Sequence, residues 1–175
     1  KKRFLYTIEF FPEEGKYHFD GHRDCGVRFS PEETKANKGI CPKCKKRLTV
    51  GVMNRVDQLA DRPDGFKPES AIPFKSLIPL DEIIAEAKGL KKDSVAVEKE
   101  YFSVLAKFGT ELDILMRANR VELEKGLAPK VAEGVLRMRE GKVTRLAGYD
   151  GEYGVIKVFG QDAQRQAGEK QLNLF

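Results

Sequence analysis

Two short pairs of metal-ligand residues constrain the first third of this chain. His22 and Cys25 are separated by two residues, and Cys41 and Cys44 repeat that spacing after an interval of fifteen residues. Two residues between ligands suit a tight turn, and the interval allows two such turns to face each other around one ion. Because three thiolates and one imidazole fill the four positions of a tetrahedral ion, the pattern predicts a closed, structural Cys3His zinc site.

Other uses of these residues have weaker support. Three cysteines cannot all pair as disulfides, and a redox Cys-x-x-Cys motif lacks a thioredoxin-like context here. His18 could replace His22 as the imidazole ligand, but six residues separate it from Cys25, which fits a tight turn poorly. We therefore favour His22, although the sequence leaves the choice between the two histidines open.

The positive charge of the chain lies in the same segment as the cysteines. Residues 1–60 contain 13 Lys and Arg against 8 Asp and Glu, whereas residues 61–175 contain 19 of each. Concentrated basic charge favours phosphate binding, because neutralised phosphates release counterions. We expect nucleic-acid contacts from the basic residues around the second ligand pair: Lys43, Lys45, Lys46 and Arg47. A merely solvated, lysine-rich surface is the alternative.

A second set of nucleic-acid-binding candidates lies near the C-terminal end. Its basic members are expected on the last helix and on the first arm of a hairpin: Arg137, Arg139, Lys142 and Arg145. Asp150-Gly151 predicts a type I′ turn between two hairpin arms, 142–148 and 152–159. The flanking Tyr149 and Tyr153 are candidates for stacking on an unstacked base. A solvated helix face and plain hairpin packing are the alternatives for these two groups.

The order of elements predicts an α+β protein, in which a small zinc-ribbon-like module precedes a helical domain that ends in a β-hairpin. We expect four segments: a strand and zinc module over 1–62, a proline-rich linker or strap with a short helix over 63–93, the helical domain and hairpin over 94–160, and a tail over 161–175. A strand is expected over 3–11, a capped helix from Ser30, and one helix over 110–125.

No stretch approaches the ~18 apolar residues of a membrane span, and no secretion signal is present, so we expect a cytoplasmic protein with no membrane partner. The chain opens at Lys1 directly in an apolar stretch, which suggests a piece of a longer protein.

The last residues of the chain are similar to the peptides that dock on bacterial sliding clamps: Gln171, Leu172, Leu174 and Phe175. Packing of this end on its own domain is the alternative.

Several long motifs resemble those of the endonuclease Q family. They are GKYHFDGHRDC at 15–25, ICPKCKKRLTVGVMNRVDQLADRP at 40–63, SAIPFKSLIPLDEIIAEA at 70–87, FGTELDILMRA at 108–118 and AGYDGEYGVIKVF at 147–159. The chain is similar to the C-terminal half of these proteins, whose N-terminal half is a polymerase-and-histidinol-phosphatase (PHP) domain. The likeness extends over nearly the whole chain except the tail.

This resemblance implies the DNA-binding portion of a DNA-repair hydrolase that nicks the strand 5′ to deaminated bases and abasic sites. DNA and the missing PHP domain would be its partners, and the catalytic metal ions would lie outside this chain, so we expect the fragment alone to be inactive. The zinc ligands carry over onto His22, Cys25, Cys41 and Cys44. Two rivals remain: a free-standing zinc-ribbon adaptor for nucleic acid or protein, and a hydrolase with its own metal site at His18, Asp20 and Asp24.

Overall fold

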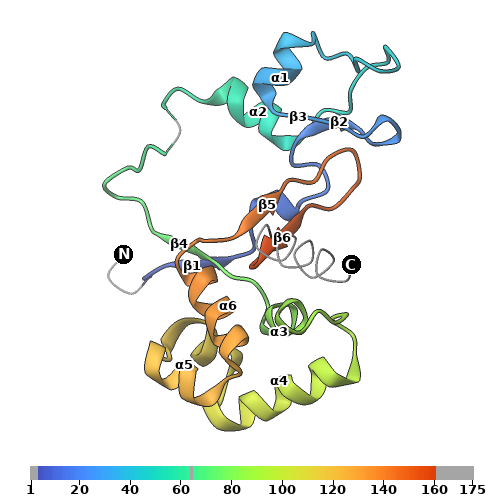
Figure 1. The fold of residues 1–175 in the computed structure, drawn as a ribbon. Coiled ribbons are helices and arrows are strands. Elements are labelled where there is room, and N and C mark those ends of the chain that lie inside the picture. Colours follow the sequence, from blue (N-terminus) through green and yellow to red (C-terminus); the bar gives the residue numbers. More distant parts are fainter. Residues whose placement is uncertain (1–3, 64, 161–175) are drawn as a thin grey trace, which may run out of the picture. The chain divides into compact units, whose positions relative to one another are not determined.

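The computed structural model describes residues 4–63 and 65–160, which form two compact units. The first unit runs to Ser76 and also includes Arg145–Ile156, whereas the second contains Leu77–Thr144 and resumes at Lys157. Each unit is thus assembled from segments that are far apart in the sequence (Figure 1). The mixture of helices and short strands confirms the expected α+β class.

Short strands and tight turns make up the centre of the first unit. The antiparallel strands β2 (Asp20–His22) and β3 (Val27–Phe29) are joined by a 3-10 helix, η2 (Arg23–Cys25). Gly26, at φ +60°, ends η2 in the left-handed region, which costs glycine nothing because it has no Cβ. A small apolar core lies beside these elements, formed by buried Val27, Cys41 and Leu48.

Helix α1 (Pro31–Ala36) begins at the predicted capping box. The Glu33 amide donates to Ser30 Oγ, and the Ser30 amide donates to the Glu33 carboxylate. Two donors that would otherwise lack a helical partner are satisfied in this way. The confirmed cap shows that this helix start is encoded locally.

Helix α2 (Val52–Leu59) begins without a local side-chain cap, and its first two amides donate to the carbonyls of Tyr17 and His18 at 2.8 and 3.0 Å. The buried carboxylate of Asp20, on β2, accepts hydrogen bonds from the Gly51 amide at 2.6 Å and from the Asn54 side chain at 2.7 Å. Most apolar side chains of the helix are exposed, with Val52 and Leu59 more than 60% exposed, whereas Met53 is half-buried. The polar face of α2 therefore packs on the unit, and its apolar face is left uncovered there.

The strand expected over residues 3–11 is shorter in the structure. β1 (Thr7–Glu9) pairs in parallel with β4 (Phe74–Ser76), and a 3-10 helix, η1 (Pro12–Glu14), follows β1. At the end of the proline-rich segment β4 is hydrogen-bonded to β1, although the Phe74 side chain remains exposed.

The predicted C-terminal hairpin is confirmed. Strands β5 (Thr144–Leu146) and β6 (Val155–Lys157) form a two-stranded sheet. At the tip, Asp150 and Gly151 have φ values of +45° and +86°, as a type I′ turn requires. The amide of the residue before the turn and the amide of the residue after it each donate to the other's carbonyl.

The second unit is a helical bundle around one apolar core. Its helices are α3 (Leu80–Lys88), α4 (Val95–Phe108), α5 (Arg120–Gly126) and α6 (Pro129–Arg139). The side chains that are at most 1% exposed include Leu80, Ile83, Ile84, Val97, Ile114, Leu123, Val131, Val135 and Val158. Among the described residues, no helix has the length and apolar content to cross a membrane.

The single helix predicted over 110–125 is wrong. A π-helical turn, η3 (Asp113–Arg117), is followed by a break at Ala118, and Asn119 then caps α5. Arg139, from α6, donates to the carbonyls of Ile114, Leu115 and Ala118 at 2.6–2.9 Å. A side chain from another helix thus satisfies carbonyls that a continuous helix would have used itself, which local sequence could not reveal.

Candidate metal centre and nucleic-acid interface

The four predicted ligands come together in the first unit. The ligand atoms of His22, Cys25, Cys41 and Cys44 all lie within 4.8 Å of one another, and His22 Nε2 is 3.8 Å from Cys44 Sγ. With metal–sulfur bonds of about 2.3 Å, ligand atoms around one tetrahedral zinc ion are separated by roughly 4 Å. The cluster therefore fits a metal ion such as zinc. Within residues 4–63 and 65–160, no second group of this kind is found.

The second ligand pair lies on a tight turn shaped by its backbone. The Cys41 amide donates to the Lys46 carbonyl at 2.8 Å, and the Lys45 amide donates to the Cys41 carbonyl at 2.9 Å. Lys45 has φ +65°, an uncommon conformation for a residue with a Cβ. This closed loop points both sulfur atoms of the pair toward the other two ligands, as a zinc-ribbon turn does.

The pKa values of two ligand thiols are shifted in opposite directions. Burial raises the pKa of a thiol, but the amides of Cys44 and Lys43 donate to Cys41 Sγ and hold its pKa below the ordinary value. At Cys25, burial and the neighbouring sulfurs of Cys44 and Cys41 raise the pKa to about 11. Three sulfurs held this close favour a bound cation, which would stabilise all three as thiolates.

Of the two histidines, His22 lies in the cluster and His18 does not. The ring of His18 lies at the Pro12 carbonyl, with its Nδ1 2.9 Å from that oxygen, and it does not belong to the cluster. Nδ1 of His22 is buried and has no hydrogen-bond partner among the described residues, while its Nε2 faces the sulfurs. With four protein ligands the site would have no open position, so a bound zinc ion would be structural.

The hairpin tip is anchored beside the ligand cluster. The Asp150 carboxylate accepts the Arg23 amide at 2.7 Å, and the Phe19 amide donates to the Gly148 carbonyl at 2.9 Å. The Tyr149 ring lies so close to Gly21 that a Cβ there would be 2.3 Å from it. These contacts join residues more than 120 positions apart, and no local sequence signal could have found them.

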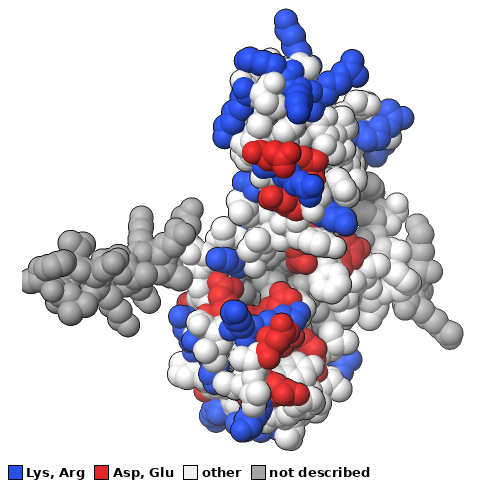
Figure 2. All heavy atoms as spheres, turned by 90° about the vertical axis from the view of Figure 1, so that its right-hand side faces the viewer, with Lys and Arg blue, Asp and Glu red and all other residues white. Residues whose placement is uncertain are grey.

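The predicted basic residues around the second ligand pair are all exposed. We call Lys43, Lys45, Lys46 and Arg47 the knuckle residues. Figure 2 shows Lys and Arg side chains gathered over the part of the first unit that lies at the top of this view. One of the three ammonium protons of Lys43 is already used within the protein, since its Nζ donates to the Cys25 carbonyl at 2.6 Å. Exposed Arg23 and Lys38 are further basic residues of this unit, signalled in the sequence only by its excess of positive charge.

The second basic set does not form one cluster. Arg145 belongs to the first unit, where it lies 3.2 Å from Glu13, whereas the other three belong to the second unit. Lys142 is 2.7 Å from Glu140, and Arg137 is 3.6 Å from Glu133. Arg139 is occupied by the carbonyls after η3, so we omit it from the interface proposed below.

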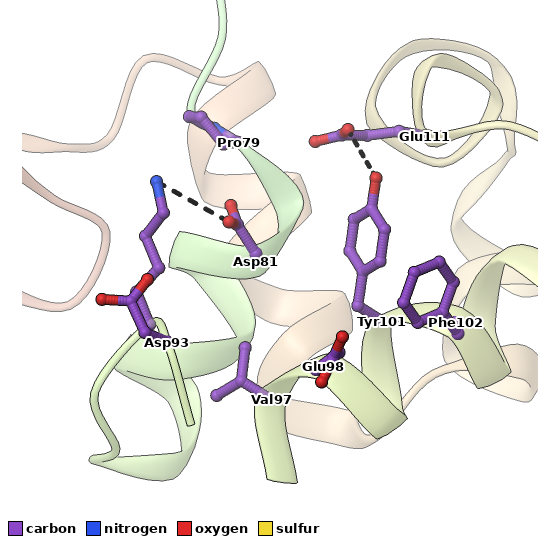
Figure 3. Close-up of a pocket in the computed structure, with 9 residues that line it drawn as sticks. Pro79, Asp81, Asp93, Val97, Glu98, Tyr101, Phe102 and Glu111 are labelled. Carbon is purple, nitrogen blue, oxygen red and sulfur yellow. Dashed lines mark hydrogen bonds and ion pairs between the residues drawn. The ribbon is translucent and has the colours of Figure 1, made fainter. Parts of the chain in front are cut away.

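A hollow of about 550 Å³ in the second unit has a different charge (Figure 3). Its lining carries one lysine and four carboxylates: Lys92, Asp81, Asp93, Glu98 and Glu111. The Tyr101 hydroxyl donates to Glu111 at 3.0 Å, and Lys92 Nζ is 3.6 Å from Asp81. Because the carboxylates outnumber the lysine, this hollow repels phosphate and is not a candidate for DNA binding.

The rival metal site at His18, Asp20 and Asp24 is not formed. Asp20 is buried and already accepts two hydrogen bonds at the start of α2, whereas the Asp24 side chain is 83% exposed. The predicted clamp-binding residues Gln171, Leu172, Leu174 and Phe175 lie outside the described residues, so that role stays a prediction.

Comparison with known proteins identifies the class of fold. One crystal structure, of the lesion-specific endonuclease PfuEndoQ from Pyrococcus furiosus, matches 94% of this chain and 41% of its own, with a TM-score of 0.77 and 26% identity. A second, of endonuclease Q with a 27-mer duplex substrate that has an abasic lesion at the active site, matches 87% of this chain and 38% of its own, with a TM-score of 0.72 and 29% identity. The chain has an endonuclease Q-like fold, and the resemblance seen in its motifs is confirmed.

Sequence relatives agree with this assignment. A family model described as the MJ0043 C-terminal domain matches residues 79–142, within the second unit. The uncharacterized protein MJ0043 of Methanocaldococcus jannaschii is 36% identical over 148 residues, and the uncharacterized protein YqxK of Bacillus subtilis is 30% identical over 148. The chain spans 18% and 34% of these two proteins, so it corresponds to a minor part of each.

Proposed function

We propose that this chain is the DNA-binding portion of a DNA-repair endonuclease related to endonuclease Q. The observation that carries the proposal is the likeness, over 87% of the chain, to an endonuclease Q structure that holds a duplex substrate. The exposed basic residues of the first unit support it, because lysine and arginine bind the phosphates that dominate DNA affinity.

In this proposal the ligand cluster binds structural zinc and fixes the turn that presents the knuckle residues to phosphates. Cleavage 5′ to deaminated bases or abasic sites would be performed elsewhere in the parent protein, by a PHP domain with its own metal ions. The described residues support a binding role, since their one metal-ligand cluster has no open position for a substrate.

The test is a salt titration of duplex binding. Each phosphate neutralised by the protein contributes about 0.9 to the slope of log affinity against log salt. Lys46→Gln combined with Arg47→Gln should lower the slope by up to roughly two and weaken all duplexes alike, because phosphate contacts read no sequence. Lys91→Gln combined with Lys99→Gln removes the same charge from the second unit and should leave the slope unchanged.

An unchanged slope in the Lys46 and Arg47 variant would remove the knuckle residues from the interface. Absence of any duplex binding by the zinc-loaded chain at low salt would contradict the proposal as a whole. Metal-dependent nicking of uracil-containing DNA by this chain alone would contradict the assignment of cleavage to another part of the parent protein.

A further inference from the structure

The first ligand turn receives a hydrogen bond from the far end of the chain. His22 directly precedes the 3-10 helix η2 and Cys25 is its last residue, so the backbone of η2 sets the positions of these two ligands relative to each other. The His22 side chain makes no capping hydrogen bond to η2. The first amide of η2, that of Arg23, donates instead to the Asp150 carboxylate at 2.7 Å. A distant carboxylate therefore serves the turn as a local cap usually does.

The backbone around Asp150 fixes the direction of its carboxylate. The Gly151 amide donates to the Lys16 carbonyl at 2.9 Å, and the Phe19 amide donates to the Gly148 carbonyl at 2.9 Å. In Figure 1 the loop between β5 and β6 accordingly lies beside β2 and β3. Asp150 is half-buried there and has the left-handed φ of the type I′ turn. The fold thus holds the carboxylate at the ligand turn.

Other side chains of the hairpin contact different parts of the first unit. The Tyr149 ring packs against Gly21 of β2, whereas the Tyr153 side chain is 73% exposed. Arg145 pairs with Glu13 at 3.2 Å. Among these side chains and that of Asp150, the Asp150 carboxylate is the group that is hydrogen-bonded to η2.

A bond from a carboxylate to a ligand turn affects the metal that the turn binds. Asp150 is ionised at neutral pH, and hydrogen bonds that involve an ionised group are shorter and stronger than neutral ones. Fixing the η2 backbone before an ion arrives lowers the entropy cost of bringing His22 and Cys25 together. Groups that orient metal ligands in this way commonly change metal affinity 10- to 100-fold without touching the ion.

We propose that Asp150 is a positioning residue of the metal site. It is not one of the four ligands, and it acts by holding the turn that carries His22 and Cys25. Because linkage is reciprocal, a bound ion also strengthens the attachment of the hairpin tip to this turn. The inference rests on the metal binding included in the proposed function, and it adds to that site a residue more than 100 positions away from every ligand.

The test measures the zinc affinity of the chain by competition with a chromophoric chelator. Asp150→Gly removes the acceptor and keeps the turn, because glycine accepts positive φ and Gly-Gly also forms type I′ turns. It should lower zinc affinity by about ten-fold or more. Asp150→Asn keeps an acceptor oxygen and should restore most of the affinity. Glu13→Gln, the matched control, weakens the Arg145 ion pair of the same hairpin and should leave zinc affinity unchanged.

A second measurement separates positioning of the ligands from general stabilisation of the unit. Metal binding is coupled to folding, so any loss of stability in the first unit also weakens zinc binding. The visible absorption of Co²⁺, bound in place of zinc, reports the geometry of its ligands. At saturating Co²⁺, Asp150→Gly should shift these bands relative to the unmodified chain, and Asp150→Asn should not. A purely structural contribution would leave the bands of all variants the same.

Hydrogen exchange in the unmodified chain provides a measurement that needs no variant to fold. In the zinc-loaded chain the Arg23 amide should be protected, since the Asp150 carboxylate is its acceptor. Fast exchange of this amide would overturn the inference.

The remaining outcomes separate the inference from the function on which it rests. Equal zinc affinity of Asp150→Gly and the unmodified chain, an equal loss in Glu13→Gln, or unchanged Co²⁺ bands would overturn the role of Asp150 and leave the metal site intact. Failure of the unmodified chain to bind zinc would overturn the metal site of the proposed function itself.

Discussion

The two units are stabilised by different means. The small core around the ligand cluster contains three buried residues, and each described strand of the first unit is three residues long. The second unit buries large aliphatic side chains from every one of its described helices. Apolar burial contributes about 25 cal/mol per Å², so the second unit can obtain its stability from its core. Small domains with few buried residues generally rely on a metal ion or another cross-link, so we expect the first unit to depend on an ion bound by the ligand cluster.

The two units also differ in surface charge. The first exposes lysine and arginine around the ligand cluster, whereas one hollow of the second is lined mainly by carboxylates and another of equal volume by equal numbers of basic and acidic side chains. The proposed function places phosphate binding in the unit that contains the ligand cluster. We therefore expect DNA affinity to depend on whether the ligand cluster holds a metal ion, and not on the packing of the helices in the second unit.

Metal removal should produce the largest effect. Structural zinc contributes on the order of 10–16 kcal/mol in small zinc domains, so Cys41→Ser or chelation should unfold the first unit and leave the helices of the second folded. Hydrogen exchange resolved by residue would show fast exchange in β2, β3 and α1 and continued protection in α3 and α6. Asp24→Asn, a change at an exposed neighbour of the cluster, should have no such effect. Loss of hydrogen-exchange protection in both units together would show that the second unit also depends on the metal ion.

A cavity in the helical core should have the converse effect. Ile84 is fully buried on α3, and Ile84→Ala should destabilise the second unit by about 2–5 kcal/mol. Urea denaturation followed by helical signal measures the loss, and zinc content should be unaffected. Val95→Ala removes a similar group from a position 63% exposed, and it should change stability little. A loss of bound zinc in Ile84→Ala would show that the two units do not fold independently.

Removing the Arg139 guanidinium, which donates to the carbonyls at the end of η3, should have a smaller effect. Arg139→Met leaves the carbonyls of Ile114, Leu115 and Ala118 without their donor, at a cost of about 1–3 kcal/mol. Arg117→Met makes the same substitution at a side chain 77% exposed and should be nearly neutral. Equal stability of the two variants in urea would mean that solvent replaces the Arg139 contacts.

The smallest expected effect is a pH dependence at Asp113, in the second unit. Hydrogen bonds from Thr110 and from Arg117 hold the pKa of Asp113 below its ordinary value. A carboxyl group with a lowered folded-state pKa stabilises the protein above its unfolded pKa, and this contribution is lost as the pH falls through the folded value. The unmodified chain should therefore lose more stability between pH 7 and pH 3 than Asp113→Asn. Identical losses in urea titrations at the two pH values would contradict the assignment.

Sequence by itself determined the features that depend on neighbouring residues. The spacing of His22, Cys25, Cys41 and Cys44 predicted the ligand cluster, because two intervening residues suffice to form each ligand turn. The Ser30 capping box and the Asp150-Gly151 turn were predicted for the same reason, since each is formed by contacts within four residues.

Tertiary structure alone decided features that depend on distant partners. The carbonyls of Tyr17 and His18 accept the first amides of α2, and Arg139 binds the carbonyls at the end of η3, where the sequence predicted a continuous helix. The hairpin tip reaches the ligand cluster through the contact of Asp150 with Arg23, 127 residues away. Buried polar groups and free helix ends must find hydrogen-bond partners wherever the fold supplies them, and periodicity within a short window contains no information about which distant side chain that will be.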